Sequence, residues 1–346
     1  MSKSTISTLS IPAIVSISFL LSISGCKEPK AKAEETGAAV KITAPTPPTT
    51  TDAKSPLPPS KIIEGVGFVF PGTVVIDKKR DNYLISNANL RPMENENNGF
   101  VSKVSPAGNV VDLKWIEGGK NGVTLISPKG MAIRDDILYI ADRTDIHKFG
   151  LNDGAPMGSI AVENATFLND IALAADNTLY VTDTGLTYSM GKLAPNRTDA
   201  IYAIDDKEEV TQFVKGESLE NPNGIIATPE GLYVASFTGS KLIFVSYKGR
   251  ISTSASLPGA TLDGIAELPN GELLVTSWKT STVYKGTPDG KFVAFKANLK
   301  GPSDLTYDLS RRRVVIPLAK QNALLFQPLD TSKEQDVLLS CGSAIK

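Results

Sequence analysis

The sequence predicts an all-β fold, a six-bladed β-propeller with four-stranded blades, and three observations carry this prediction. Between residues 61 and 330, six similar hairpin units recur at intervals of about 40 to 57 residues, within the range of propeller blades. No stretch of useful length has the apolar spacing of a helix. A row of such sheets would leave edge strands exposed, and closing the row into a ring removes those edges. A solenoid and a pair of β-sandwiches are the alternatives, and six near-equal units favour the propeller over both.

Each unit begins with a small or polar pair of residues and continues as a strand of alternating residues. It then turns tightly and returns as a second strand that ends in a polar residue. The pairs Glu230-Gly231 and Asn270-Gly271 are turn dipeptides that suit hairpins. In chain order, the six hairpins cover residues 72–87, 129–142, 169–183, 223–236, 263–277 and 303–317.

Two more strands complete each unit, for example residues 241–247 and 250–256 in the fourth. One strand, over residues 61–70, is left over before the first unit. We expect it to pair with residues 323–328 in the last blade and so close the ring.

The connection between the second and third strands is long in blade one (residues 87–99) and in blade three (residues 183–199). Long loops in a compact domain are often functional. These two carry Met93, Tyr188 and Met190, and they either roof a pocket at the channel mouth or only decorate the surface.

Residues 1–25 have the features of a secretory signal, with an apolar run over residues 11–23 that is too short to span a bilayer comfortably. Residues 23–26, Ile-Ser-Gly-Cys, resemble the lipobox of bacterial lipoproteins, in which the cysteine is acylated after cleavage. An ordinary signal followed by a chance cysteine is the alternative. Acylated Cys26 would anchor the protein without a transmembrane helix. Lys27 favours the outer membrane of the cell envelope, with the protein facing the periplasm or the exterior.

Residues 26–60 are rich in Pro, Thr and Ala and cannot bury a core, so we expect a disordered tether between the lipid and the propeller. The propeller occupies residues 61–330. Residues 331–346 form a C-terminal tail, in which Cys341 is a bystander thiol.

Composition excludes several classes of function. The formal charge of −1 gives no attraction to nucleic acid. Two cysteines and one histidine, His147, are too few for a disulfide scaffold or a zinc site built from Cys and His. Any metal would therefore be a hard cation held by oxygen. The run Arg311 to Arg313 spans a hairpin turn and is expected to be a solvated corner, with contact to anionic lipid as the alternative.

Three blade starts carry a resemblance to a known family: residues 167–171 (Phe-Leu-Asn-Asp-Ile), 221–225 (Asn-Pro-Asn-Gly-Ile) and 262–265 (Leu-Asp-Gly-Ile). They resemble the SMP-30/gluconolactonase/LRE family, and NHL-repeat propellers share the same blade pattern. The resemblance implies a divalent cation, often calcium, in the central channel. Its ligands here would be Asn169, Asn223 and Asp263. Each begins the innermost strand of a different blade, so their oxygens can converge on the ring axis.

Two positions depart from the family pattern. The family has a metal-binding Glu at the start of blade one, where this chain has Gly72. Lys129 occupies the matching place in blade two, where its ammonium would compete with a cation for Asp263. At the mouth of the channel Ser303 and Asp304 of blade six add oxygens that offset these two departures. The alternative is structural, because Asn and Asp also satisfy backbone groups in turns.

Two functions from different classes remain open. One is a divalent-metal-dependent hydrolase of a lactone or related ester, with Asp170 or Asp304 handling a proton. Paraoxonase-like relatives use a channel histidine as base, but the position of His147 on a middle or outer strand favours a surface residue. The other function is a non-catalytic, NHL-like binding or scaffold propeller of the cell envelope. In both cases the partner at the channel mouth is a small molecule or an envelope protein.

Overall fold

The computed structural model describes residues 56–89, 96–189 and 192–331. The predicted signal, Cys26, nearly all of the predicted tether, Met93, Met190 and Cys341 lie outside these residues. No helix in the described part of the chain is long and apolar enough to cross a membrane.

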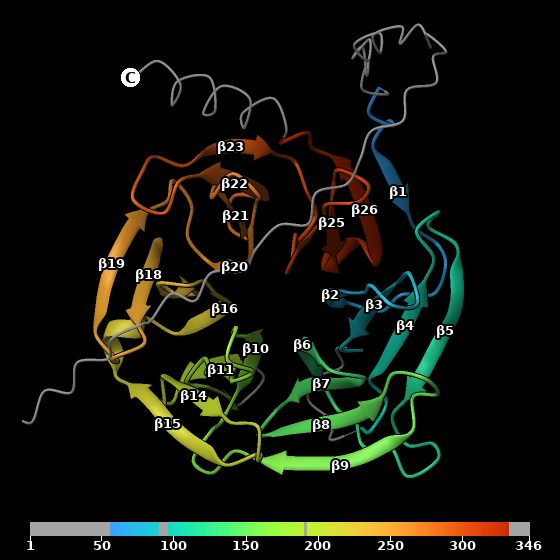
Figure 1. The fold of residues 1–346 in the computed structure, drawn as a ribbon, viewed down its shortest axis with the longest axis horizontal. Helices are drawn as coiled ribbons and strands as arrows, with labels where there is room; N and C mark the ends of the chain where they lie inside the picture. The colour runs from blue at the N-terminus through green and yellow to red at the C-terminus, as the bar shows by residue number, and fades with distance from the viewer. Residues whose placement is uncertain (1–55, 90–95, 190–191, 332–346) are drawn as a thin grey trace, which may run out of the picture. The chain divides into compact units, whose positions relative to one another are not determined.

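Six four-stranded antiparallel sheets stand around a common axis (Figure 1), which confirms the predicted all-β, six-bladed propeller. From the innermost to the outermost strand, blade one comprises β2 (Pro71–Asp77), β3 (Asn82–Asn87), β4 (Phe100–Val104) and β5 (Val110–Glu117); blade two β6 (Pro128–Arg134), β7 (Ile137–Asp142), β8 (Asp145–Gly150) and β9 (Pro156–Ala161); blade three β10 (Leu168–Leu173), β11 (Leu179–Asp183), β14 (Ala200–Ile204) and β15 (Val210–Lys215); blade four β16 (Pro222–Ala227), β17 (Gly231–Ser236), β18 (Lys241–Ser246) and β19 (Ile251–Ser256); blade five β20 (Leu262–Glu267), β21 (Leu273–Ser277), β22 (Thr282–Gly286) and β23 (Val293–Lys296); and blade six β24 (Thr306–Asp308), β25 (Arg313–Leu318), β26 (Ala323–Pro328) and β1 (Lys61–Ile63).

A separate hairpin, β12 (Leu186–Ser189) and β13 (Lys192–Pro195), lies within the long loop of blade three. Two three-residue 3₁₀ turns, η1 (Glu217–Leu219) and η2 (Ala319–Gln321), are the helical segments of the described residues.

The ring closes as predicted, because β1 pairs antiparallel with β26 as the outermost strand of blade six. The closing strand is shorter than the predicted residues 61–70 and ends at Ile63. Gly65 and Gly67 follow with φ of 69° and 100°, a left-handed conformation that ends a strand and that glycine adopts at little cost.

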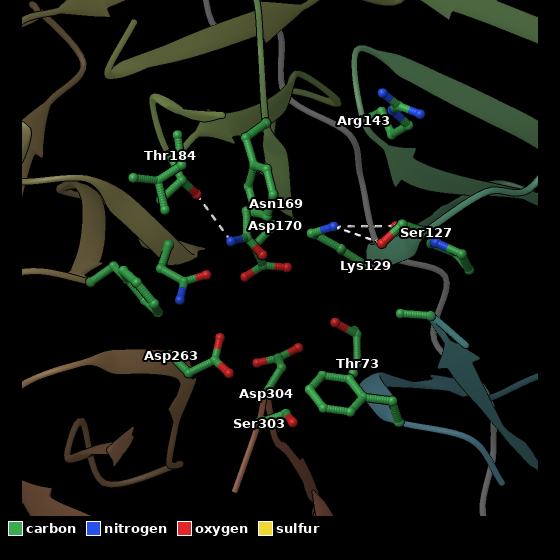
Figure 2. Close-up of a pocket in the computed structure, with 18 of the residues that line it drawn as sticks. Thr73, Ser127, Lys129, Arg143, Asn169, Asp170, Thr184, Asp263, Ser303 and Asp304 are labelled. Atoms are coloured by element: carbon green, nitrogen blue, oxygen red, sulfur yellow. Dashed lines mark hydrogen bonds between the residues drawn. The ribbon is translucent and has the colours of Figure 1, made fainter. Parts of the chain in front are cut away.

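A β-bulge at the start of the innermost strand in five of the six blades aims two residues at the axis. In blade three, Leu168 pairs with Asp183 and Ile171 with Val181, so two residues oppose only Thr182. The same register shift occurs in blades one, two, four and five. The side chains of these bulges project into the central channel (Figure 2).

Glycines let the innermost strands of neighbouring blades touch. A Cβ atom on Gly224 would lie 2.1 Å from the backbone oxygen of Asp263, and one on Gly264 would lie 2.3 Å from the Cα of Asp304. Gly130 meets Asp170 in the same way. This close approach makes residues from successive blades direct neighbours around the axis.

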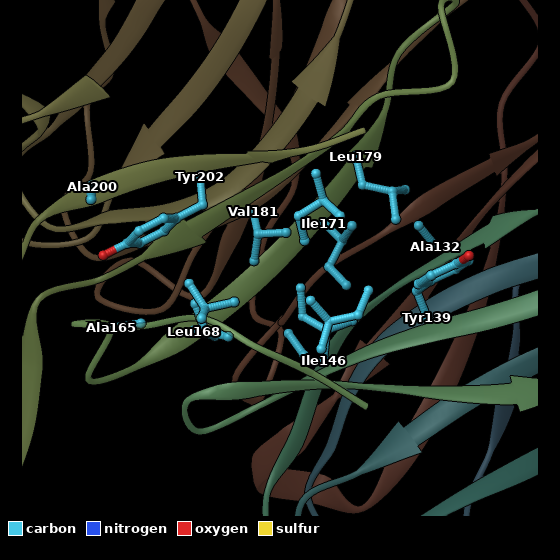
Figure 3. Close-up of a cluster of buried hydrophobic side chains, with 14 residues drawn as sticks. Ala132, Tyr139, Ile146, Ala165, Leu168, Ile171, Leu179, Val181, Ala200 and Tyr202 are labelled. Atoms are coloured by element: carbon cyan, nitrogen blue, oxygen red, sulfur yellow. The ribbon is translucent and has the colours of Figure 1, made fainter. Parts of the chain in front are cut away.

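The hydrophobic core lies between adjacent blades rather than in the channel. Figure 3 shows the cluster between blades two and three, where Tyr139 and Ile146 face Leu168, Ile171 and Val181. Burying each such Leu or Ile side chain stabilises the fold by roughly 1.5–3 kcal/mol. Similar clusters join the other blades and hold the channel residues in place.

The prediction of a solvated corner at Arg311 to Arg313 is wrong. Arg313 is buried, lies 3.9 Å above the ring of Phe326 and donates to the hydroxyl of Tyr83 at 2.6 Å. Arg311 forms ion pairs with Asp81 and Asp308. These contacts link blade six to blade one, and only ring closure brings their partners together.

Candidate functional site

A cavity of about 380 Å³ opens at the mouth of the central channel, a size suited to a small molecule. All six blades contribute to its wall. It brings together every residue that the sequence placed at the channel: Gly72, Lys129, Asn169, Asp170, Asn223, Asp263, Ser303 and Asp304. In Figure 2 the carboxyl groups of Asp170, Asp263 and Asp304 point toward one another from three different blades.

Asn223 carries an oxygen atom without a partner. Its side chain is 3% exposed, and its Nδ2 donates to the backbone oxygen of Leu262 at 3.1 Å. Its Oδ1 is shielded from solvent and has no hydrogen bond among the described residues. A buried polar atom of this kind usually has a ligand, a water or an ion as its partner. The Nδ2 of Asn169 donates to the hydroxyl of Thr184 at 3.0 Å.

Asp263 combines burial with two stabilising neighbours. Its Oδ2 accepts a hydrogen bond from the indole of Trp278 at 2.6 Å. Burial raises its pKa to about 6, although the hydrogen bonds from Trp278 and Asn223 and the charge of Lys129 act in the opposite direction. The desolvation of the carboxylate is therefore the larger effect.

Asp170 and Asp304 belong to opposite blades of the ring, the third and the sixth. Burial raises the pKa of Asp170 to about 7, although its carboxylate accepts the backbone N–H groups of Ile171 and Ile225 at 2.8 and 2.9 Å. Burial and the charge of Asp170 raise the pKa of Asp304 well above its ordinary value, against hydrogen bonds that include one from Thr73. Three carboxylates in so small a space cannot all ionise easily without a cation.

Lys129 lines the blade-two side of the pocket. Its Nζ donates to Ser127 Oγ at 3.0 Å and lies 4.3 Å from the centre of the Phe167 ring. No carboxylate of the described residues lies within 4.0 Å of it, so the expected competition for Asp263 acts only at longer range. Burial lowers its pKa to about 8.

Both long loops reach the pocket. The blade-one loop contributes Glu96 and Asn98, and the blade-three loop contributes Leu186 and Thr187. The side chain of Tyr188 lies outside the described residues, so its predicted place over the pocket stays a prediction.

The sequence reasoning missed several lining residues that share one position. Each follows the polar residue that ends the second strand of its blade, and each lines the pocket: Ala88, Arg143, Thr184, Phe237 and Trp278. Counting one residue onward in each repeat would have found them. Phe70 and Phe167, just before the bulges, complete the aromatic part of the wall.

His147 does not belong to the pocket. It lies on β8, the third strand of blade two, with its side chain 13% exposed and its Nε2 3.7 Å from Asp142. The predicted strand position is right, but the residue is mostly buried within the blade rather than on the surface.

No known family profile and no curated protein matches the sequence. Solved structures do match. A gluconolactonase from Xanthomonas campestris is 16% identical with a TM-score of 0.62, over 78% of this chain and 90% of that one. Virginiamycin B lyase from Staphylococcus aureus is 15% identical with a TM-score of 0.57, over 78% and 99%. The chain has a gluconolactonase-like fold. A chain of a nidogen/laminin complex, 17% identical with a TM-score of 0.54, matches over 67% of this chain and 87% of its own length. This gluconolactonase-like propeller thus shares its fold with enzymes and with a member of a protein complex.

Proposed function

We propose that the protein is a divalent-metal-dependent hydrolase of a lactone or related ester. The observation that carries the proposal is the buried, unpartnered Oδ1 of Asn223 in a pocket that three carboxylates line, those of Asp170, Asp263 and Asp304. This oxygen is already desolvated and fixed in place, so binding a cation would cost it no hydration of its own. The fold of a gluconolactonase supports the same reaction class.

A hard cation in this pocket would need amide oxygens among its ligands. No group of three or more His, Cys, Asp and Glu side chains among them is arranged to hold a metal. Asn169, Asn223 and Asp263 would therefore be the ligands, and calcium accepts such a mixture of amide and carboxylate oxygens. When bound, the ion would act as a Lewis acid toward the carbonyl group of the substrate.

The other residues of the pocket have definite tasks in this proposal. Asp304 is partly exposed to the pocket, whereas Asp170 is buried and accepts two backbone N–H groups. Asp304 is therefore better placed to take a proton from a water molecule. Asp170 would orient the neighbouring strand and tune the charge of the cluster. The aromatic rings of Phe70, Phe167 and Trp278 would exclude water from the bound substrate.

A non-catalytic binding propeller is the second candidate, favoured by a specific observation. Gly72 gives blade one no carboxylate at its bulge, and Lys129 places a positive charge in the same pocket. Both reduce the number of ligands that a metal could use. For either function we propose that the chain is held at the bacterial envelope by acylated Cys26, with the pocket open to a small molecule or an envelope protein.

Metal analysis and thermal melting test the hydrolase proposal. The purified protein should contain a divalent cation, melt at higher temperature in calcium than in EDTA, and hydrolyse lactones in calcium. Asn223→Ala should abolish the calcium-dependent shift, and Asn196→Ala, in an exposed loop, should leave it unchanged. No bound metal and no shift in the unmodified protein would end the hydrolase proposal and favour the binding propeller.

A further inference from the structure

The wall of the pocket has two chemically different sides. Asp170, Asp263 and Asp304 approach from blades three, five and six. Ser127, Lys129 and Arg143 approach from blade two, and Figure 2 shows these three on the side away from Asp263. We call Ser127, Lys129 and Arg143 the basic wall.

Lys129 is held in the basic wall by neutral groups. Its ammonium group has the hydroxyl and backbone oxygen of Ser127 and the face of Phe167 as neighbours. A partly desolvated ammonium group without a close carboxylate is costly, because neutral acceptors replace its hydration incompletely. Repulsion from Arg143 also adds to this cost. An anion placed against Lys129 would remove both disadvantages at once.

The carboxylates of the pocket do not supply that anion. Asp263 is engaged by Trp278 and Asn223, and Asp142 accepts the backbone N–H groups of Ile126 and Ser127 from behind the wall. Glu96 lies at the rim, where it accepts a hydrogen bond from Asn98.

We propose that the basic wall binds the carboxylate of a small acidic ligand, so that the substrate of the proposed hydrolase is a lactone or ester that carries a carboxylate. Lys129 would form a charge-assisted hydrogen bond to the carboxylate, and Arg143 would add positive charge at the rim. The aromatic rings would cover the apolar body of the ligand. Its carbonyl group would then face Asn223 and Asp263. As a statement about the substrate, this inference rests on the proposed function.

Binding of a ligand that cannot be hydrolysed tests the basic wall separately from catalysis. Pyroglutamate is a lactam that carries a carboxylate, and pyroglutamamide is its neutral counterpart of nearly the same shape. By calorimetric titration in calcium, the protein should bind pyroglutamate at least about tenfold more tightly than pyroglutamamide, the range expected for a hydrogen bond to a charged group.

Variants assign the preference to Lys129. Lys129→Met should remove the preference for pyroglutamate while leaving the affinity for pyroglutamamide within about twofold, and Lys129→Arg should keep most of the preference. Lys248→Met, an exposed lysine in blade four, is the control and should change nothing. Unchanged binding of pyroglutamamide shows that the Lys129→Met pocket is folded.

Two results would overturn the inference. One is equal affinity for the two compounds, including no measurable binding of either. The other is a preference that survives Lys129→Met, because the carboxylate would then bind a cation or another residue. If the preference depends on Lys129 but no lactone is hydrolysed, the proposed reaction is wrong and the basic wall is right.

Discussion

Replacing Asp263 with asparagine tests how the pocket controls charge. Asparagine keeps the size of the side chain and an acceptor for the indole of Trp278, but it removes the charge. Burial raises the pKa of Asp263 from 3.8 to about 6. At 1.36 kcal/mol per pKa unit, ionisation of Asp263 destabilises the metal-free fold by up to about 3 kcal/mol relative to the neutral acid. The figure is an upper bound, since the side chain is only partly buried and pocket water screens it.

The direction of the pH dependence follows from the raised pKa. The folded protein holds the proton more tightly than the unfolded chain, so this contribution to stability is fully present below pH 3.8 and is lost as the pH rises through 6. The Asp263→Asn variant keeps this contribution at every pH, because asparagine does not ionise. Without metal, the free energy of unfolding of the variant should therefore gain on that of the unmodified protein by up to about 3 kcal/mol between about pH 4 and pH 8.

Urea unfolding in EDTA at several pH values measures this difference. Asp289→Asn, an exposed carboxylate in the turn between β22 and β23, is the matched control and should give a difference that is independent of pH. In calcium at about pH 8 the unmodified protein should instead be the more stable of the two, because only the unmodified protein gains stability from the ion. A constant difference between Asp263→Asn and the unmodified protein across the pH range would refute the reasoning.

Three further predictions concern how the ring is built. Gly224→Ala places a Cβ against a backbone oxygen of the next blade and should lower the free energy of unfolding, measured with urea, by about 2–4 kcal/mol. Gly72→Ala is the control: its Cβ meets only a side-chain hydroxyl at 3.2 Å, and the same measurement should show a loss of under about 1 kcal/mol. Ile63→Ala in the closing strand should cost about 2–4 kcal/mol, and Ile62→Ala, 49% exposed, should lower the melting temperature far less. Arg313→Met should cost about 2–3 kcal/mol through buried hydrogen bonds left unmade, and a melting temperature unchanged within error would contradict that role.

The pocket was predictable because it follows from a local pattern that repeats. In blade three, Asn169 and Asp170 come just before the alternating apolar residues of the innermost strand. The bulge forms at that point in five blades, so equivalent positions could be matched along the sequence without knowing any contact. Ring closure then follows from the spare strand, because an unpaired edge must find a partner.

Contacts between blades could not be predicted in the same way. The position of Lys129 depends on Phe167, which belongs to the next blade, and the burial of Arg313 depends on Tyr83, which belongs to the first. The number of residues between the two members of each pair does not follow from the repeat pattern. A sequence pattern shows which residues face the axis. The direction of a long, flexible side chain depends on which neighbouring residues it can pack against, and those belong to other blades.

The charges of the pocket connect the proposed metal to the protons that the carboxylates hold without it. Asp170, Asp263 and Asp304 would carry three negative charges if all were ionised, and Lys129 balances one of them, while the charges of Arg143 and Glu96 in the same wall are opposite and cancel. A divalent cation would balance the other two. In its absence the same balance requires protons, and the raised pKa values of Asp170 and Asp304 show where these would bind. Protons on these carboxylates and a cation held nearby would therefore be alternative ways to balance the charge of one pocket, so calcium should bind more weakly as the pH falls below about 7 and should release protons when it binds.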